Sequence, residues 1–259
     1  MSHPISTCVC CYLIGIVCFT ADMPQVVAGD PKPDTEWTEL ITDAGLAGWR
    51  PVKEEEPHEW QAVEAVELDP QDQQRFSIRP GNGVLTNAQQ AGKTQNLLSE
   101  KNYSDVEAHI EFNLPGGSNS GVFFMALYEL QVADSYGKPE IVFSDCGGFY
   151  ARPVDGKWVG GVAPQTNACK PAGNWQTYDV KFRAPRFDAD GNKTENARFL
   201  QVLHNGVVIH KNVEMEGPNS AHLDIPEAPA GPLMLQGDHG PIAYRNVRIR
   251  EVSWDDTED

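Results

Sequence analysis

Short runs in which apolar and polar residues alternate recur along most of the chain. Residues 106–112, VEAHIEF, and residues 128–132, YELQV, both follow this pattern, and Leu233 and Leu235 alternate with their neighbours. A period of two places apolar side chains on one face of a β-strand and polar side chains on the other. Asn205-Gly206 lies between the runs QVLH and VVIH, where it provides the residues that a type I′ hairpin turn requires.

Turn residues separate these runs along the whole chain, and Asp190-Gly191 marks another loop tip. We find no internal repeat and no long helical period. Many short strands with Gly, Pro and Asn between them are typical of β-sandwiches and jelly rolls. The pattern therefore predicts an all-β, jelly-roll β-sandwich that forms a single domain over residues 37–254.

The long apolar run of the chain is residues 8–19, CVCCYLIGIVCF. It is too short to span a bilayer but fits the hydrophobic segment of a signal peptide, and Val26 and Ala28 fit a cleavage site. We expect a signal peptide over 1–28, a linker over 29–36 and an acidic tail over 255–259. The domain would be exported, periplasmic or extracellular, and free of the membrane after cleavage. An uncleaved anchor or a mis-chosen start codon are the alternatives.

Acidic residues outnumber basic ones, with 37 Asp and Glu against 20 Lys and Arg and a net charge of −17. Such a surface repels phosphate backbones, so nucleic acid is not expected as a partner. It also disfavours anionic lipid and polyanionic substrates. Neutral sugars remain compatible with this charge.

Removal of the signal peptide would leave two of the six cysteines, Cys146 and Cys169. Two cysteines in an exported domain suggest one disulfide. Two independent free thiols are the alternative. Their spacing matches no metal-binding motif.

Polar residues interrupt the strand pattern at 116–125, GGSNSGVFFM, and at 128–134, YELQVAD. Asn119 in the first segment can hydrogen-bond sugar hydroxyls, or it can belong to an ordinary turn. Glu129 and Gln131 in the second share one strand face, which is either a ligand cleft or a solvated surface. Asp134 has the opposite parity, so the spacing does not support the paired carboxylates of ordinary glycosidases.

A third polar segment, 233–250, contains Gln236, Asp238 and His239 at a Gly-rich turn. A histidine titrates near neutral pH and can bind metal, although it can also simply cap a turn. Arg245 shares strand parity with the apolar residues that follow it. We therefore expect Arg245 to point inward, where it needs an acceptor, and Glu129 is the expected partner.

Several segments together resemble the 3-keto-disaccharide hydrolase domain family, in the family's order and over nearly the whole mature chain. These segments are GWR, GVLTN, NYSDVEAHIEFNLPGGSNSGVFFM, YELQVADSYG, CGGFY, KPAGNWQTYDVKF, LHNGVVI and PLMLQGDHGPIAYRNVRIREV. The resemblance implies a concanavalin-like jelly roll that binds sugar on its concave face. It also implies an exported bacterial protein that hydrolyses glycosides already oxidised at C3.

The functional residues of that family look like Asn119, Glu129, Gln131, Asp134 and His239 in this sequence. The chain differs from many members at Met125, where they carry Arg. Hydrolysis of a 3-keto-glycoside by elimination requires a base, an acid and a group that stabilises an enolate. We expect Glu129 or His239 to be the base and the other to be the acid.

Arg245 or a divalent metal would stabilise the enolate, although no cofactor is certain. Asn119, Gln131 and Gln236 would orient hydroxyl groups. The main alternative is a sugar-binding module without activity, which would use Trp158 or Trp175 as an aromatic platform and carry no perturbed carboxylate. A structural interaction domain is a third interpretation.

Overall fold

The computed structural model describes residue 1 and residues 36–87 and 94–254. Most of the expected signal peptide and linker, residues 2–35, lies outside the described residues, and so does the acidic tail, 255–259. Within the described ranges, no helix has the length and apolar character needed to cross a membrane.

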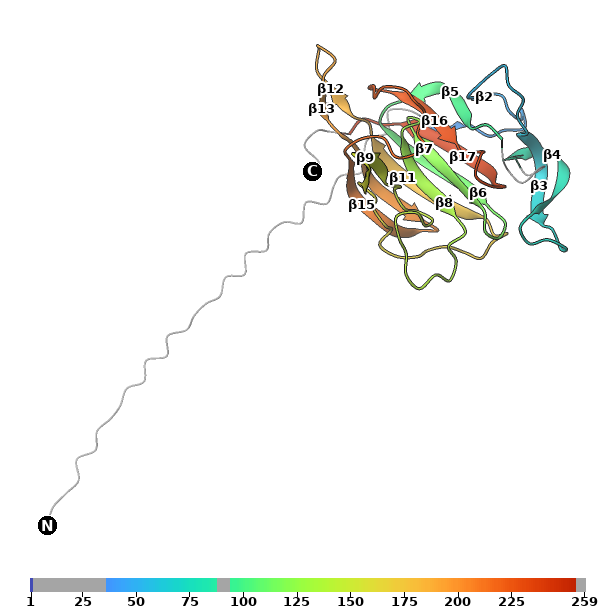
Figure 1. The fold of residues 1–259 in the computed structure, drawn as a ribbon, viewed down its shortest axis with the longest axis horizontal. Coiled ribbons are helices and arrows are strands. Elements are labelled where there is room, and N and C mark those ends of the chain that lie inside the picture. The colour runs from blue at the N-terminus through green and yellow to red at the C-terminus, as the bar shows by residue number, and fades with distance from the viewer. Residues whose placement is uncertain (2–35, 88–93, 255–259) are drawn as a thin grey trace.

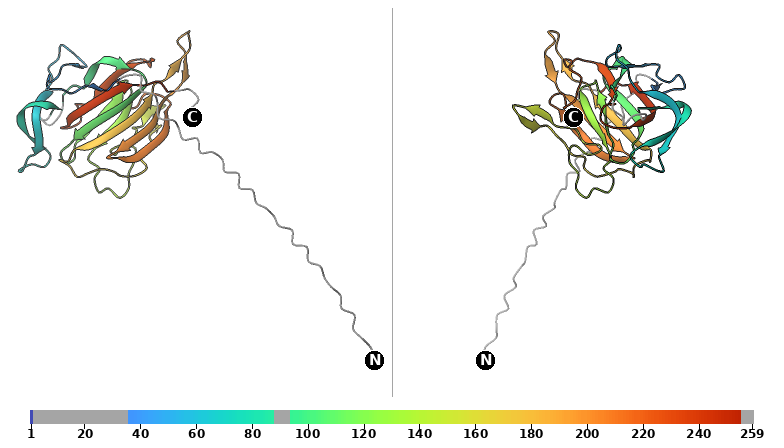
Figure 2. Two further views of the ribbon diagram at one scale, coloured as in Figure 1. Left: turned by 180° about the vertical axis from the view of Figure 1, so that it is seen from behind. Right: turned by 45° about the vertical axis from the view of Figure 1, so that its right-hand side comes forward.

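The strands form two main antiparallel sheets (Figures 1 and 2). The larger sheet has eight strands, in the order β15 (Val207–Met215), β14 (Ala197–His204), β11 (Gln176–Arg183), β6 (Val106–Asn113), β17 (Ala243–Glu251), β4 (Phe76–Thr86) and β3 (Gln61–Leu68), with β1 (Thr38–Glu39) also paired to β17. The smaller sheet has five, in the order β2 (Trp49–Pro51), β5 (Leu97–Tyr103), β16 (Gly231–Leu235), β7 (Asn119–Phe124) and β8 (Tyr128–Ala133).

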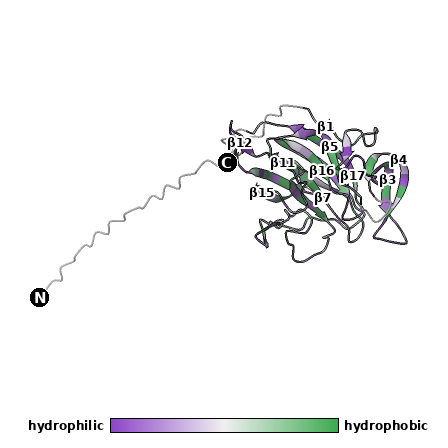
Figure 3. Ribbon diagram, turned by 45° about the horizontal axis from the view of Figure 1, so that its top comes forward, coloured by the Kyte–Doolittle hydropathy of each residue, from purple (hydrophilic) through white to green (hydrophobic). Residues whose placement is uncertain are grey.

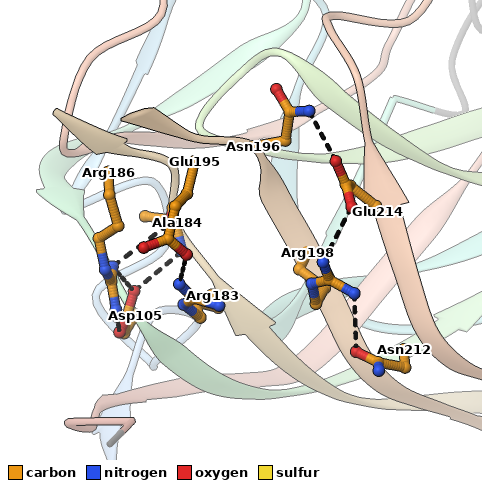
Figure 4. Close-up of polar contacts among 9 residues, drawn as sticks. All are labelled: Asp105, Arg183, Ala184, Arg186, Glu195, Asn196, Arg198, Asn212 and Glu214. Carbon is orange, nitrogen blue, oxygen red and sulfur yellow. Dashed lines mark hydrogen bonds and ion pairs between the residues drawn. The ribbon is translucent and has the colours of Figure 1, made fainter. Parts of the chain in front are cut away.

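Two short hairpins complete the described fold, β9 (Arg152–Val154) with β10 (Lys157–Val159), and β12 (Arg186–Phe187) with β13 (Lys193–Glu195). Figure 1 shows β12 and β13 at one end of the sandwich and the β3–β4 pair at the other. The β12–β13 hairpin lies close to the ion pairs drawn in Figure 4, in which Arg186 holds the carboxylate of Asp105 at 2.7 Å.

The core lies between the two sheets because each strand turns its apolar face toward the other sheet. In β6 the apolar residues of the alternating pattern are buried. Phe124 of the smaller sheet meets Phe182 and Phe199 of the larger one, with ring centroids 5.1 and 5.2 Å apart. Hydrophobic residues gather in the central strands (Figure 3). The predicted all-β sandwich is confirmed.

A hairpin turn and a β-bulge set the side-chain alternation in the larger sheet. Asn205 and Gly206 both have positive φ, 52° and 79°, between β14 and β15, so the predicted hairpin is present. In β17, Asn246 has a φ of 45° and the register shifts between Arg245 and Arg248. This β-bulge inserts an extra residue, so the strict alternation assumed for this strand does not hold.

Candidate functional site

The smaller sheet has a polar patch on the face that is turned away from the core. Tyr128, Leu130 and Val132 of β8 belong to the core between the sheets. Because side chains alternate along a strand, Glu129 and Gln131 point to the opposite face. The prediction that these two side chains share one face is confirmed.

Neighbouring strands add to this face through their register. Phe123 of β7 lies opposite Glu129, and Gly121 lies opposite Gln131. Just beyond β16, the backbone N–H of Gln236 donates to the carbonyl of Gly121 at 2.9 Å. A Cβ atom on Gly121 would lie 2.6 Å from Glu129 Oε1, which is closer than such atoms approach. Glycine at position 121 therefore makes room for the Glu129 carboxyl group.

A cavity of about 150 Å³ opens on this face. Strands β7 and β8 contribute the lining residues Asn119, Glu129 and Gln131. The turn after β16 contributes Gln236 and His239. Loops supply three further lining residues, Tyr150, Ser220 and Ala221, and the β9–β10 hairpin supplies Trp158. The cavity thus combines one carboxyl group, one imidazole, three amides and two aromatic rings, a set suited to a sugar ring.

Asn219 attaches the loop that carries Ser220 and Ala221 to strand β8. Its side-chain oxygen accepts a hydrogen bond from the N–H of Glu129 at 2.7 Å, and its backbone N–H donates to the carbonyl of Leu127 at 3.0 Å. Its amide nitrogen also donates to the carbonyl of Tyr150. One buried side chain therefore holds together the strand that carries Glu129 and the loop that carries Tyr150.

Glu129 is a buried carboxyl group, with 3% of its surface exposed. Burial raises the pKa of Glu129 to about 8, and the negative charge of Asp238 adds to this effect. In the part of the chain that the structure describes, no cation opposes the shift. Glu129 therefore holds its proton at neutral pH, which suits a general acid.

His239 is half-exposed at the rim of the cavity, and its Nδ1 lies 2.5 Å from an Asp238 carboxylate oxygen. A carboxylate that accepts from Nδ1–H fixes the tautomer and leaves a lone pair on Nε2. The cavity thus holds a buried carboxyl group and an imidazole on separate elements, the first on β8 and the second on the turn after β16.

The amide groups are oriented by neighbouring main-chain atoms. Gln131 Oε1 accepts from the N–H of Val132 at 3.0 Å, so its amide nitrogen is the group that can donate to a ligand. Gln236 Oε1 is buried and has no hydrogen-bond partner among the described residues. A buried oxygen without a donor is costly unless a ligand or water supplies one. A sugar hydroxyl entering the cavity would supply it.

Arg245 and Trp175, both expected at the site, lie outside the cavity lining, and the predicted contact between Arg245 and Glu129 is wrong. Arg245 does not meet Glu129, since it pairs with Glu111 on the larger sheet at 2.7 Å, and its guanidinium stacks on Trp175 at 4.0 Å. The bulge at Asn246 is the reason, because it turns both Tyr244 and Val247 into the core and leaves Arg245 outside. Trp175 makes that stacking contact and packs against a hydrophobic cluster that includes Val63, Phe76 and Ala243, outside the cavity lining.

Asp134 and Met125 also lie outside the cavity lining. Asp134 accepts a hydrogen bond from the N–H of Gly117 at 2.9 Å and so ties the ends of β7 and β8 together. Met125 is buried in the core at the turn after β7, with a φ of 58°. Met125 therefore contributes no group to the cavity lining.

The sequence interpretation missed the residues that loops bring in. Tyr150 lies within the CGGFY segment and Ser220 and Ala221 follow Asn219, but no period relates any of them to Glu129. Tyr150 and Trp158 meet edge to face, with centroids 6.2 Å apart. Trp158, which we expected only as the aromatic platform of a sugar-binding module, is 60% exposed and lines the outer part of the cavity.

The sandwich and its sugar-sized polar cavity define a carbohydrate-active protein of the jelly-roll class. The chain belongs to the family of the 3-keto-alpha-glucoside-1,2-lyase-like domain, whose model matches residues 36–250. The resemblance noted in the sequence motifs is thereby confirmed.

Solved structures agree with this assignment. A candidate glycosyl hydrolase from Parabacteroides distasonis ATCC 8503 is 26% identical, with a TM-score of 0.59 over 93% of this chain and 98% of that one. A second candidate glycosyl hydrolase from the same organism is 20% identical, with a TM-score of 0.53 over 84% of this chain and all of the other, and shows the fold alone. Among curated proteins, none matches the sequence.

Proposed function

We propose that this protein is an enzyme that cleaves the glycosidic bond of glycosides carrying a ketone at C3, by elimination followed by addition of water. The observation that carries the proposal is the buried Glu129, whose raised pKa keeps it protonated, in the same cavity as His239, which Asp238 contacts. A carboxyl group that keeps its proton and an imidazole held by a carboxylate offer a proton donor and a proton acceptor in one cavity.

The C3 ketone makes the proton on C2 acidic, and His239 Nε2 removes it. The electron pair enters the C2–C3 enolate and then forms the C1–C2 double bond as the bond from C1 to the leaving oxygen breaks. Glu129 gives its proton to that oxygen, so the first products are an alcohol and an unsaturated 3-keto sugar. Water then adds across the double bond, and the net reaction is hydrolysis.

The amide groups of Asn119, Gln131 and Gln236 serve this reaction by positioning hydroxyl groups and by donating to the developing enolate oxygen. This assignment replaces the expected part of Arg245, which lies on the other sheet. A divalent metal at the enolate oxygen is a separate question that a chelator can answer. The mechanism needs one acid and one base rather than a carboxylate pair, in agreement with the position of Asp134.

A sugar-binding module without activity is the second candidate function. The exposed Trp158, edge to face with Tyr150, favours it because such rings form platforms for sugar faces. A binding module, however, has no need of a carboxyl group whose pKa is raised to about 8. That difference makes Glu129 the residue to change.

The test compares a 3-keto-disaccharide, its unoxidised parent and a 4-nitrophenyl 3-keto-glucoside, each with and without chelator. We expect release from the keto substrates only. Glu129→Gln should lower the rate on the disaccharide by about 10²–10⁴-fold, because its leaving oxygen must be protonated. The loss should be much smaller for nitrophenolate, which leaves without a proton.

The matched control is Glu140→Gln, which changes an exposed carboxylate outside the cavity and should retain full activity. Equal losses on both keto substrates would remove the acid role from Glu129. No release from either keto substrate, with measurable binding of the parent sugar, would replace the enzyme with the binding module.

A further inference from the structure

A second group of chemically reactive side chains lies away from the cavity. Cys146 follows β8, Cys169 precedes β11 and His204 ends β14. One ligand atom from each lies within 4.8 Å of those from the other two. Cys146 is 3% exposed and His204 is fully buried. The fold therefore brings two sulfurs and an imidazole together from three separate elements.

Both cysteines are free thiols, and a hydrogen bond joins their side chains. Of the two interpretations of the sequence, the disulfide is not formed, but the thiols are neighbours rather than independent. Each sulfur also accepts a backbone N–H, from Ala133 to Cys146 and from Ser135 to Cys169. Such donors stabilise thiolates, which are the forms that bind metal.

The imidazole of His204 is held in the tautomer that a metal ligand needs. Its Nε2 lies 2.9 Å from Gln176 Oε1, and that oxygen also accepts the N–H of Lys170 at 3.0 Å. Nε2 must therefore carry the proton, and Nδ1 keeps a lone pair. Nδ1 is buried and has no hydrogen-bond partner among the described residues. Metal-binding histidines use their second nitrogen in this way.

Burial and neighbouring groups also act on the protonation of these three side chains. Burial, with a smaller contribution from Lys170, lowers the pKa of His204 to about 4, so the imidazole is neutral. Burial opposes ionisation of Cys146, but hydrogen bonds with Cys169 and Tyr178 outweigh it and lower the pKa of this thiol. That same contact with Cys146, together with burial, raises the pKa of Cys169. A divalent cation between the two sulfurs would bind both as thiolates.

We propose that Cys146, Cys169 and His204 bind one zinc ion. Two thiolates and a neutral imidazole are soft donors of the kind that zinc and monovalent copper prefer. Divalent zinc balances the two thiolate charges, whereas monovalent copper would leave a buried negative charge, which is costly. A water on the partly exposed side of Cys169 would complete a tetrahedral site.

The ion would lie directly behind the strand that carries the cavity. Tyr178 contacts the sulfur of Cys146 at 3.1 Å and donates its hydroxyl to the carbonyl of Gln131 at 2.6 Å. The N–H of Gly147 donates to that same carbonyl at 2.8 Å. Zinc would thus join two loops and the end of β14 behind Gln131 as a structural ion, and the proposal stands independently of the sugar reaction.

The test uses the full chain with Cys8, Cys10, Cys11 and Cys18 changed to Ser, so that Cys146 and Cys169 are the remaining thiols. Cobalt is added to the reduced protein, because tetrahedral cobalt shows visible bands and a near-ultraviolet thiolate charge-transfer band. We expect both bands at one equivalent, their loss when zinc displaces cobalt, and one zinc per chain after dialysis. Zinc should also raise the melting temperature.

Cys169→Ser should abolish the charge-transfer titration, while His222→Ala, which changes an exposed histidine outside the cluster, should retain it. Gln176→Leu removes the acceptor for Nε2–H and should weaken zinc binding by about 10–100-fold. Folding of each variant is checked by circular dichroism. Absence of the bands in a folded parent, or a mass two hydrogens lower with no reactive thiol, would overturn the proposal, the latter in favour of a disulfide.

Discussion

Asp105 and Glu129 are both buried carboxyl groups, 6% and 3% exposed, but the protein treats them in opposite ways. Asp105 accepts two hydrogen bonds from Arg186, at 2.8 and 2.7 Å, and one from the N–H of Ala184 at 2.9 Å (Figure 4). Among the described residues no such cation acts on Glu129, and the charge that affects its pKa is the negative Asp238. One carboxylate is paired, whereas the other is left to keep its proton.

The difference distinguishes a carboxyl group that stabilises the fold from one that is suited to chemistry. A buried carboxylate that is fully paired stabilises the chain around it, here by joining the turn before β6 to β12. A buried carboxyl group without a partner costs stability and persists in proteins mainly where chemistry requires it. The same change, from carboxyl to amide, should therefore have opposite effects at the two positions.

The largest effect on stability is expected for Asp105→Asn, which removes the charge that Arg186 faces. We expect the free energy of unfolding to fall by about 3 kcal/mol, because a partly buried guanidinium loses its partner. Urea denaturation measures the change. Glu64→Gln, in an exposed pair with Arg79, should change the free energy by less than about 1 kcal/mol. Equal effects at both positions would show that the buried Asp105–Arg186 pair contributes no more to stability than the exposed pair.

Glu129→Gln should act in the opposite direction and stabilise the protein at pH 7 by about 2–3 kcal/mol. The unfolded chain loses the Glu129 proton near pH 4.5, while the folded protein keeps it until about pH 8. Stability contributed by this group therefore falls as the pH rises between these values. The gain should vanish near pH 4, whereas Glu140→Gln should show no such trend. Thermal unfolding measured across pH tests this prediction. A Gln variant that is less stable than the parent at pH 7 would contradict the assigned pKa.

The smallest effect is expected for Asp238→Asn, which removes the negative charge that adds to the raised pKa of Glu129. The pKa should move to lower pH, as followed by ¹³C NMR of the carboxyl carbon. The alkaline limb of kcat/KM should move with it, since Glu129 must be protonated to act. Asp238→Glu keeps the charge and should leave the limb in place. A shift to higher pH in the Asn variant would contradict this account.

Prediction from sequence succeeded where the pattern is local. The alternation in 106–112 and 128–132 gives β6 and β8, and the two-residue spacing of Glu129 and Gln131 is enough to place both side chains on one face. It failed at Arg245, because one residue at positive φ, Asn246, reverses the parity on which the prediction rested. The local pattern of apolar and polar residues does not predict a bulge of this kind.

The amino-acid sequence by itself determined the strands, the hairpin at Asn205-Gly206 and the polar residues that face outward from β8. Only the tertiary structure decided that loops carrying Tyr150 and Ser220 close over Glu129 and deprive its carboxyl group of water. The same holds for the cluster of Cys146, Cys169 and His204. Strand periodicity is a property of neighbouring residues, whereas burial and pKa depend on segments that the sheet register brings together from far along the chain.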